Sequence, residues 1–357
     1  RGRRSGRARA RGDQAGQQPL VGDDLNPRFL STVMLREMAI GGFALAVSNI
    51  AGGLVPYFAL PRLSLGGAAL GVLWGLPLCA IGYAIDSSED LTAANVVRST
   101  SLGVCLMFGA RRRPVKVAAA AAAVCVVTGV SEEFLCRGVF LPWLTTAANS
   151  PAAGILGSSL AFAMAHWIPG DFSPEARFIL LLEFVYGLMF CCAYVLSGDI
   201  LVPIVAHTVY DFVTMLTAHF RVSKQFDYIE TVLADAQFGL DKESPKVRSD
   251  VDRMMTAGEV GMVGLRQARL MFLLMDTGAN GYLDKKELRV GLMALSKDIA
   301  DVDKLFAEAD GDRDGRLDFG EFLQCYARSG LGVASFYSKG FLQQLPMAQL
   351  LRYRWPY

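Results

Sequence analysis

Two adjacent glutamates, with an arginine one helical turn later, interrupt a long apolar stretch and are the residues best suited to chemistry. Glu132 and Glu133 follow an almost unbroken apolar run, Val115 to Val130, and Arg137 leads into the apolar Gly138 to Leu144. Ionisable side chains inside apolar spans are costly, so they indicate a functional site. Residues four apart share a helix face, which predicts that Arg137 pairs with Glu133 and that Glu132 points about 100° away, unneutralised.

Two of the three histidines in the chain lie in the next two apolar segments. His166 ends the sequence Phe162-Ala-Met-Ala-His166, and His207 begins His207-Thr-Val-Tyr-Asp211. The spacing of four aims the His207 imidazole and the Asp211 carboxyl in the same direction along a helix. If the three helices converge, Glu132, His166 and His207 share one buried pocket.

The composition is that of a membrane protein with a soluble appendage. Of the 357 residues, 52% are hydrophobic, and the formal net charge is only +1, with a mean hydropathy of +0.33. These values predict a lipid bilayer environment and six to eight apolar helices, several of about 20 residues. We expect no nucleic-acid partner.

The third histidine, His219, lies near the end of the last apolar stretch, where we expect it at the membrane interface. The apolar stretches are Met38 to Leu60, Ser64 to Ile85, Leu102 to Ala110, Val115 to Leu144, Ile155 to Ile168, Phe178 to Leu196 and Ile200 to Phe220.

Two twelve-residue segments near the carboxyl terminus, 276–287 and 310–321, carry oxygen-bearing groups at the spacing of calcium ligands. A hard cation takes six to eight oxygens, here from loop positions 1, 3, 5, 7 and 9, with glutamate at 12 and glycine at 6. The two segments, flanked by helix-like sequences, resemble an EF-hand pair with Ca²⁺ as the cofactor. The predicted ligands are Asp276, Asn280, Tyr282, Asp284 and Glu287 in the first loop and Asp310, Asp312, Asp314, Arg316, Asp318 and Glu321 in the second.

The two loops are unequal. Position 3 of the first loop is Gly278, which has no side-chain oxygen, whereas the second loop has a carboxylate there. We therefore expect the second loop to bind calcium more tightly. One hypothesis is that calcium changes the helix angle and exposes a Leu- and Met-rich groove that contacts the membrane part. The alternative is a module that keeps its fold without exchanging calcium.

The three membrane motifs, in order, are Glu-Glu-x-x-x-Arg, Phe-x-x-x-His and His-x-x-x-Asp. Together they resemble the CPBP family of intramembrane proteins, which includes type II CAAX prenyl endopeptidases and bacteriocin-processing relatives. The resemblance covers roughly Val115 to Phe220. It implies an all-α, polytopic helical membrane bundle and, in active members, metal-independent hydrolysis of a membrane-associated peptide or protein.

The resemblance also implies a role for each residue of the motifs. Glu132 corresponds to the general base, His166 helps to orient the attacking water, and His207 assists the oxyanion. Glu133 and Arg137 correspond to residues that support the architecture. Donors in a dry site stabilise an oxyanion more strongly than donors in water, so the arrangement is physically coherent.

Asp211 departs from the family pattern, in which the third motif commonly ends in asparagine. An ionised carboxylate cannot donate to an oxyanion, so either the oxyanion hole relies on His207 alone or peptidase activity is weak or absent. Glu132, His166, His207 and Asp211 are also a minor candidate set for Zn²⁺. A third interpretation is that these polar side chains only bond helices together in lipid.

By composition, the chain divides into five parts. We expect a transit peptide or disordered basic leader at 1–30, a transmembrane domain at 31–220, a charged linker at 221–250, the EF-hand pair at 251–329 and a tail at 330–357. The arginine-rich, acid-poor leader favours an organelle membrane, with the chloroplast ahead of the mitochondrion or endoplasmic reticulum. The leading hypothesis is a calcium-regulated intramembrane endopeptidase. The alternative is a non-proteolytic scaffold or chaperone that changes partners with calcium.

Overall fold

The computed structural model describes residues 24–50, 63–88, 90–234, 239–294 and 302–328. Every regular element in these ranges is a helix, and the one β contact among them is an isolated bridge between Leu283 and Leu317. The predicted all-α class is therefore confirmed. Residues 1–23 of the predicted leader at 1–30, and the whole predicted tail at 330–357, lie outside the described residues.

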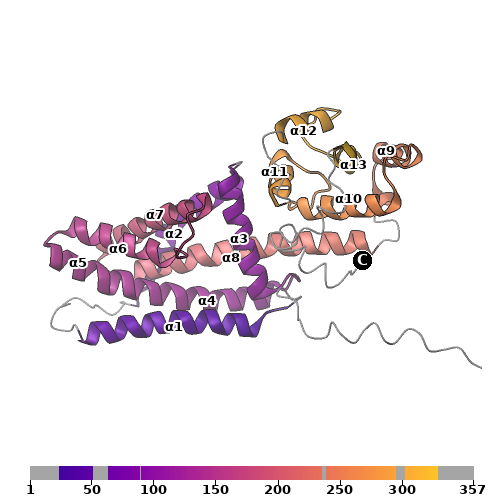
Figure 1. The fold of residues 1–357 in the computed structure, drawn as a ribbon. Helices are drawn as coiled ribbons and strands as arrows, with labels where there is room; N and C mark the ends of the chain where they lie inside the picture. Colours follow the sequence, from indigo (N-terminus) through magenta and orange to yellow (C-terminus); the bar gives the residue numbers. More distant parts are fainter. Residues whose placement is uncertain (1–23, 51–62, 89, 235–238, 295–301, 329–357) are drawn as a thin grey trace, which may run out of the picture.

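A bundle of long helices makes up the first two thirds of the chain (Figure 1). Its helices are α1 (Pro27–Ile50), α2 (Leu65–Ser87), α3 (Leu91–Phe108), α4 (Pro114–Glu133), the π-helical η1 (Phe134–Phe140), α5 (Leu141–Ala148), α6 (Pro151–Ala165), α7 (Pro174–Ser197) and α8 (Leu201–Leu233). Six stretches in the described ranges are long and apolar enough to cross a membrane, and α6 is a shorter apolar helix. This agrees with the predicted six to eight helices and with an integral membrane protein.

The remaining helices form a smaller carboxy-terminal module beside the far end of α8 (Figure 1). They are the 3₁₀ turn η2 (Leu240–Lys242), α9 (Pro245–Thr256), α10 (Met262–Met275), α11 (Lys285–Ala294), α12 (Val302–Ala309) and α13 (Phe319–Arg328). The hydrophobic core of this module includes the aromatic rings of Phe272, Phe319 and Phe322. It is joined to the bundle by α8, which belongs to both parts.

Small residues let α8 approach its neighbours closely within the bundle. A Cβ added to Gly71 of α2 would lie 2.5 Å from the Val205 Cβ of α8, and one on Gly129 of α4 would lie 2.7 Å from the Thr208 Oγ1. Close backbone approach through small residues is a typical way for helices to associate in lipid. These contacts fix α8 against α4 near His207.

Much of the predicted charged linker at 221–250 is helical. Helix α8 continues without a break to Leu233, and α9 begins at Pro245. Proline is well tolerated at the first turn of a helix, where its missing N–H has no partner to lose, and the Ser244 side chain accepts a hydrogen bond from the Val247 N–H. The polar residues that suggested a linker lie between buried apolar positions of these helices.

Two further helices begin earlier than hydropathy predicts. Helix α1 starts at Pro27, inside the expected leader, and α3 starts at Leu91 rather than near Leu102. Polar residues lower the hydropathy of these segments but have partners inside the fold. The Asn95 Nδ2 of α3, for example, donates to the Glu175 Oε1 of α7 at 2.8 Å.

Candidate active site and calcium-binding loops

The Glu132-Glu133 pair lies where α4 changes into the π-helical segment η1. A π segment widens the helix and leaves backbone groups in need of other partners, and such segments are frequent at functional sites. Here the Ser158 hydroxyl of α6 donates to the Cys136 carbonyl at 2.7 Å. The irregular turn is thus held by a neighbouring helix, and it presents both carboxylates toward the centre of the bundle.

Glu133 and Arg137 form the predicted i, i+4 ion pair, which is confirmed. Arg137 Nη1 donates to Glu133 Oε1 at 2.9 Å, and both side chains are fully buried. Arg137 Nη2 also donates to the Gly187 carbonyl of α7 at 2.8 Å. The guanidinium lies over the rings of Phe162 and Phe190, 4.8 and 5.2 Å from their centroids. One side chain therefore connects three helices.

His207 of α8 is the centre of a chain of polar contacts. Its Nδ1 donates to Glu133 Oε1 at 3.0 Å, which leaves Nε2 facing the cavity side. The Nε2 atom lies 3.4 Å from Asp211 Oδ2 and 4.0 Å from Glu132 Oε2. The imidazole also stacks on the Phe190 ring, with centroids 4.8 Å apart and planes 16° apart. The ring orientation is thus set by Glu133 and Phe190.

Glu132 differs from Glu133 in lining a cavity with an oxygen that no protein group satisfies. Its side chain is 12% exposed, and within the described part of the chain its Oε2 is buried without a hydrogen-bond partner. This oxygen belongs to a cavity of about 260 Å³ between α1, α4, α6, α7 and α8. A buried carboxylate oxygen without a partner is costly unless water or a ligand contacts it. The acidic and imidazole groups of the cavity lining are Glu132, His166, Glu183, His207 and Asp211.

His166 enters the same cavity from the end of α6. It is the residue that caps this helix, and its Nδ1 lies 3.0 Å from the Phe162 carbonyl oxygen. Glu132, His166, His207 and Asp211 therefore line one cavity. Their chemical roles stay predictions.

Sequence reasoning missed two acids near this cavity. Glu183 of α7 lines it, and Glu37 of α1 is fully buried and near enough to Glu132 to interact with its charge. Glu183 is a lone acid inside the predicted apolar stretch from Phe178 to Leu196, so the same cost of burying charge would have singled it out. Glu37 immediately precedes a stretch scored as apolar, where an acid is unremarkable by hydropathy.

His219, which we expect at the membrane interface, is buried by protein side chains. Its side chain is fully buried, and its ring meets Phe108 of α3 edge-on at 6.4 Å. The apolar run ends near His219, but α8 does not, because the helix continues to Leu233. His219 therefore lies inside the fold at the middle of a long helix.

The four residues proposed for zinc do not converge as a metal centre. Among the described residues, one group of three or more candidate metal ligands brings its donor atoms within 4.8 Å of one another, and it lies in the second calcium loop. Zinc requires about four donors near 2.0–2.3 Å from a common point.

The calcium loops have the backbone of a paired EF-hand. Leu283 and Leu317, at position 8 of each loop, exchange N–H to carbonyl hydrogen bonds of 2.9 and 2.8 Å. Positions 4 and 6 have positive φ in both loops: Ala279 (48°), Gly281 (84°), Arg313 (61°) and Gly315 (81°). Glycine at position 6 adopts this conformation without a steric penalty. The two loops thus have the same backbone conformation and are paired through the bonds between Leu283 and Leu317.

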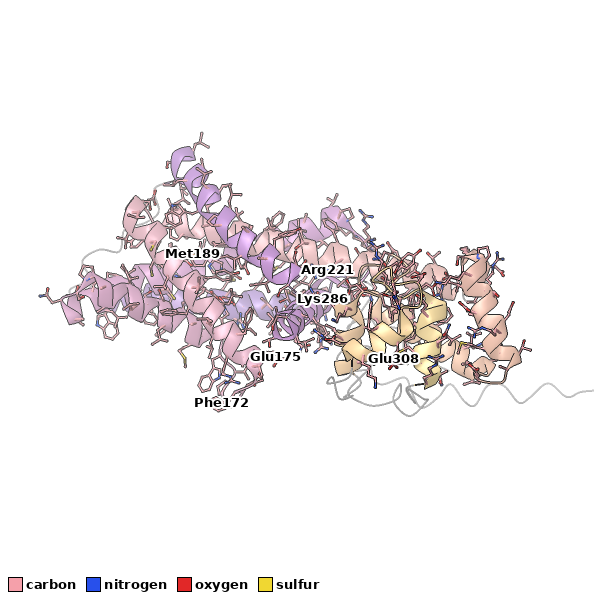
Figure 2. All side chains as sticks on the ribbon, turned by 90° about the horizontal axis from the view of Figure 1, so that it is seen from above. Phe172, Glu175, Met189, Arg221, Lys286 and Glu308 are labelled. Carbon is pink, nitrogen blue, oxygen red and sulfur yellow. The ribbon has the colours of Figure 1, made fainter. Side chains whose placement is uncertain are left out.

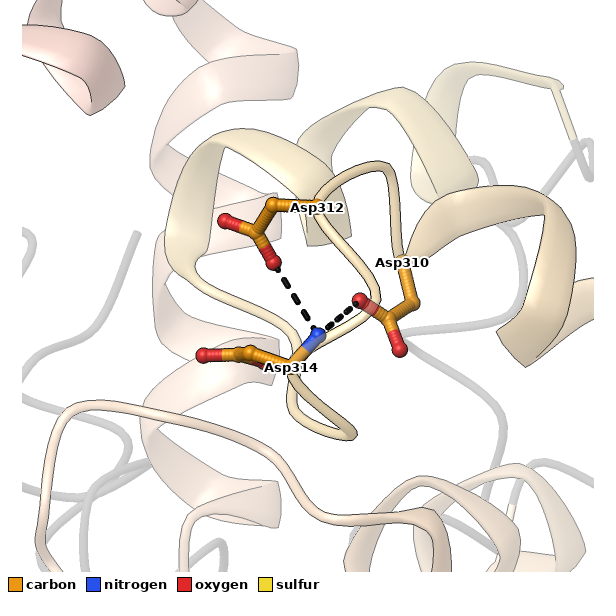
Figure 3. A group of neighbouring side chains, drawn as sticks. All are labelled: Asp310, Asp312 and Asp314. Carbon is orange, nitrogen blue, oxygen red and sulfur yellow. Dashed lines mark hydrogen bonds between the residues drawn. The ribbon is translucent and has the colours of Figure 1, made fainter.

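The second loop brings together the side-chain oxygens that a hard cation needs. Asp310, Asp312 and Asp314 gather around the turn, where the Asp314 N–H donates to the carboxylates of the other two (Figure 3). Glu321, at position 12, accepts from the Gly311 and Asp318 N–H groups. Carboxylates in this arrangement fit Ca²⁺.

The first loop is closed on itself by its own glutamate. Glu287 accepts hydrogen bonds from the Thr277 hydroxyl and from the Gly278 and Asp284 N–H groups at 2.8–3.2 Å. Burial, with a smaller contribution from Asp284, raises the pKa of Glu287 to about 7. Position 3 offers no side chain, and the Gly278 carbonyl accepts a 2.6 Å hydrogen bond from Lys224. Glu321 accepts the equivalent N–H bonds in the second loop, so the missing side chain at position 3 is the feature that agrees with the expected weaker loop.

Helix α8 runs from the cavity to the carboxy-terminal module. Four apolar residues of its second half, spaced four, three and three apart, belong to the core of the module. They are Val222, Phe226, Ile229 and Val232. The adjacent Gln225 Nε2 lies 3.1–3.3 Å from three carbonyl oxygens at the end of α10, including that of Asp276, the first residue of the first loop. The second half of α8 therefore packs against the EF-hand pair.

A second contact between bundle and module lies at Asp86, near the end of α2. Arg221 of α8 binds the Asp86 carboxylate at 2.7 Å, and Lys286 of α11 donates to the Asp86 carbonyl, also at 2.7 Å. Figure 2 shows Arg221 and Lys286 close together at the junction of the two parts. The module is thus held to the bundle by polar as well as apolar contacts.

Comparison with known proteins places each part in a family. Residues 114–213 match the family of type II CAAX prenyl endopeptidases, Rce1-like, and residues 265–327 match the EF-hand domain pair. No curated protein and no solved structure matches the chain. The first match spans all three membrane motifs, and the second spans both calcium loops. The chain therefore combines a segment that matches the Rce1-like CAAX prenyl endopeptidase family with a segment that matches the EF-hand domain pair.

Proposed function

We propose that the protein is a glutamate-dependent intramembrane endopeptidase whose activity is regulated by calcium. The observation that carries the proposal is the Glu132 Oε2, buried and without a protein partner in a cavity that also contains His166 and His207. A general base needs a proton donor within reach, directly or through one water. The test is the loss of cleavage when Glu132 is replaced by glutamine, which the Discussion develops.

In the proposed reaction, a water molecule in the cavity attacks the scissile carbonyl and Glu132 accepts its proton. Glu132 then gives this proton to the leaving amine as the C–N bond breaks. His166 orients the water, and His207, protonated at both ring nitrogens, donates from Nε2 to the developing oxyanion. Glu133 accepts from His207 Nδ1 and so keeps the other nitrogen facing the cavity. Arg137 neutralises Glu133, which would otherwise be a second uncompensated carboxylate beside the base.

Asp211 opposes part of this mechanism and favours the alternative function. Its carboxylate lies 3.4 Å from His207 Nε2, so it competes for the donor that the oxyanion requires. In that arrangement the site would be a poor peptidase, and the protein would serve as a membrane scaffold or chaperone that binds partner proteins. The same cavity could then bind a peptide segment without cleaving it.

The Asp211→Asn variant separates the two functions. The uncharged amide competes less strongly than a carboxylate for the His207 Nε2 donor, and its own N–H can donate to the oxyanion. We therefore expect the cleavage rate to rise by about tenfold or more. The measurement is the rate at which new amino termini appear in a membrane peptide library incubated with protein in lipid nanodiscs. A scaffold would show no cleavage in either form, and a fall in rate would contradict the proposed competition.

Calcium control is proposed to act through α8. In the bundle, this helix carries His207 and Asp211. Further along, Lys224 and Gln225 contact the first loop, and Phe226 packs in the core of the module. When bound, calcium would supply positive charge to the acidic loops, with the second loop's carboxylates as its main ligands. Because α8 is one continuous helix, a change in its contacts with the module alters the position of His207.

The Gln225→Met variant tests this connection. Methionine is close in size but cannot donate to the carbonyls at the end of α10, and each lost hydrogen bond weakens the grip by about 1 kcal/mol. We expect the calcium-dependent change in cleavage rate to fall by at least about half, while cleavage without calcium is unchanged. Thr231→Val is the matched control, because Thr231 is exposed and its hydroxyl bonds only within α8, to the Asp227 carbonyl. Equal calcium responses in both variants would contradict the connection.

The proposed substrate is a membrane-associated peptide or protein, and the proposed location is an organelle membrane, with the chloroplast favoured. The location follows from the arginine-rich, acid-poor residues at the start of the chain. Prenylation acts mainly on cytosolic proteins, so an unprenylated membrane segment fits this location better than a prenylated terminus. Fractionation of cells that express the chain with a carboxy-terminal tag measures the location directly.

A further inference from the structure

A lysine from outside the calcium loops lies among the ligands of the second one. The Lys246 Nζ of α9 is 2.6 Å from Asp312 Oδ2, 3.1 Å from Glu321 Oε1 and 3.3 Å from Asp318 Oδ2. These carboxylates occupy loop positions 3, 12 and 9. A single ammonium group therefore contacts three of the side chains that are expected to bind calcium.

Helix α9 holds this ammonium in place. Pro245 and the Ser244 cap start the helix one residue before Lys246, and Val247, Val251 and Met254 are buried in the core of the module. The end of the second loop fits tightly against the same helix, since a Cβ on Gly320 would lie 3.2 Å from the Asp250 Cβ. The contact is thus built from a capped, packed helix and not from a free side chain alone.

Among the residues that the structure describes, no lysine contacts the first loop in this way. The lysine beside it, Lys224, donates to the Gly278 backbone carbonyl and not to a carboxylate ligand. The carboxylates around Lys246 raise its pKa above the usual value, with the Asp312 contact the largest cause. Lysine presents a compact point charge that can replace part of the charge of a metal ion but not its coordination.

We propose that Lys246 is a tethered competitor for calcium in the second loop, which binds the ion by displacing this ammonium and loosening α9. The inference rests on the proposed calcium binding of that loop. Calcium requires the carboxylate oxygens at about 2.3–2.6 Å from itself, and oxygens that coordinate it cannot also hold the ammonium. The ion pair therefore lowers the apparent calcium affinity, and calcium binding lowers the stability of the docked α9 by the same factor.

The test is a calcium titration of the full chain in lipid nanodiscs. A Glu287→Gln background removes the bidentate ligand of the first loop, so that calorimetry with calcium alone reports the second loop. An exposed ion pair contributes up to about fivefold, and three carboxylates share this one, so Lys246→Met should bind calcium about five- to tenfold more tightly. Lys246→Arg keeps the competing charge and should stay within about twofold of the background.

The matched control is Arg248→Met, which removes one positive charge from an exposed position of the same helix. A general change in charge would affect both variants equally, whereas a tethered competitor affects only Lys246. Hydrogen exchange of residues 245–256 gives a second readout, because calcium should speed exchange there in the background protein. In Lys246→Met this calcium-dependent increase should disappear.

Each outcome is decisive. If Lys246→Met binds calcium no more tightly than the background or than Arg248→Met, the competitor is overturned while calcium binding by the loop stands. If Lys246→Arg binds as tightly as Lys246→Met, charge competition is overturned. If neither the background nor Lys246→Met binds calcium, both this inference and the proposed calcium binding of the second loop are overturned.

Discussion

Replacing Glu132 by glutamine is expected to reduce peptide cleavage by about 10²–10⁴-fold, the usual contribution of a general base. Glutamine has nearly the same shape but cannot accept the proton of the attacking water. The measurement is cleavage of a membrane peptide library by the protein in nanodiscs, carried out in ¹⁸O-labelled water. Hydrolysis places the heavy oxygen on the new carboxyl terminus, so true turnover is separated from background proteolysis.

The adjacent acid provides the control. Glu132 Oε2 has no protein partner among the described residues, so Glu132→Gln should keep the thermal stability of the wild type. Glu133→Gln removes the carboxylate that binds both Arg137 and His207, and it should lower the melting temperature as well as activity. If Glu132→Gln cleaves at the wild-type rate, Glu132 is not the general base, whatever the effect of Glu133→Gln.

The second large effect is expected on stability. Arg137→Met should lower the free energy of unfolding by about 3–5 kcal/mol, because it leaves the Glu133 carboxylate buried without its cation. Methionine keeps most of the length and fits between Phe162 and Phe190, so little of the loss should come from an empty cavity. The measurement is denaturant-induced unfolding of the purified protein in mixed micelles.

The double variant shows whether an unpaired charge is the cause. In Arg137→Met with Glu133→Gln, both ionised groups are absent, so we expect most of the stability lost in Arg137→Met to return. A double variant as unstable as Arg137→Met would indicate instead that the bond from Arg137 to the Gly187 carbonyl, or the packing on the aromatic rings, dominates.

The three membrane motifs were predictable from sequence because burying charge in an apolar helix is expensive. That cost singled out Glu132, Glu133 and Arg137, and a spacing of four gave the Glu133–Arg137 pair that the structure shows. The direction of His207 was not predictable, since its Nδ1 partner lies 74 residues away on another helix. Contacts of this kind depend on how helices converge, which periodicity within one helix cannot supply.

The continuation of α8 was missed although a signal was present. Val222, Phe226, Ile229 and Val232 repeat at helical spacing, but the charged residues between them lower the hydropathy and suggest a linker. Charge density was a poor guide here because the polar residues face loops and solvent while the apolar face fills the module. The contacts of Lys246 had no signal in the sequence at all, since they arise from how α9 docks beside the second loop.

The most direct test of the account is a comparison of protein termini in native membranes that contain either the wild-type chain or Glu132→Gln at equal abundance. If Glu132 activates water in a membrane cavity, a defined set of membrane-associated proteins should keep uncleaved termini in the variant and lose them in the wild type. Identical termini in the two membranes, with both proteins folded, would contradict an endopeptidase and leave the partner-binding scaffold as the function.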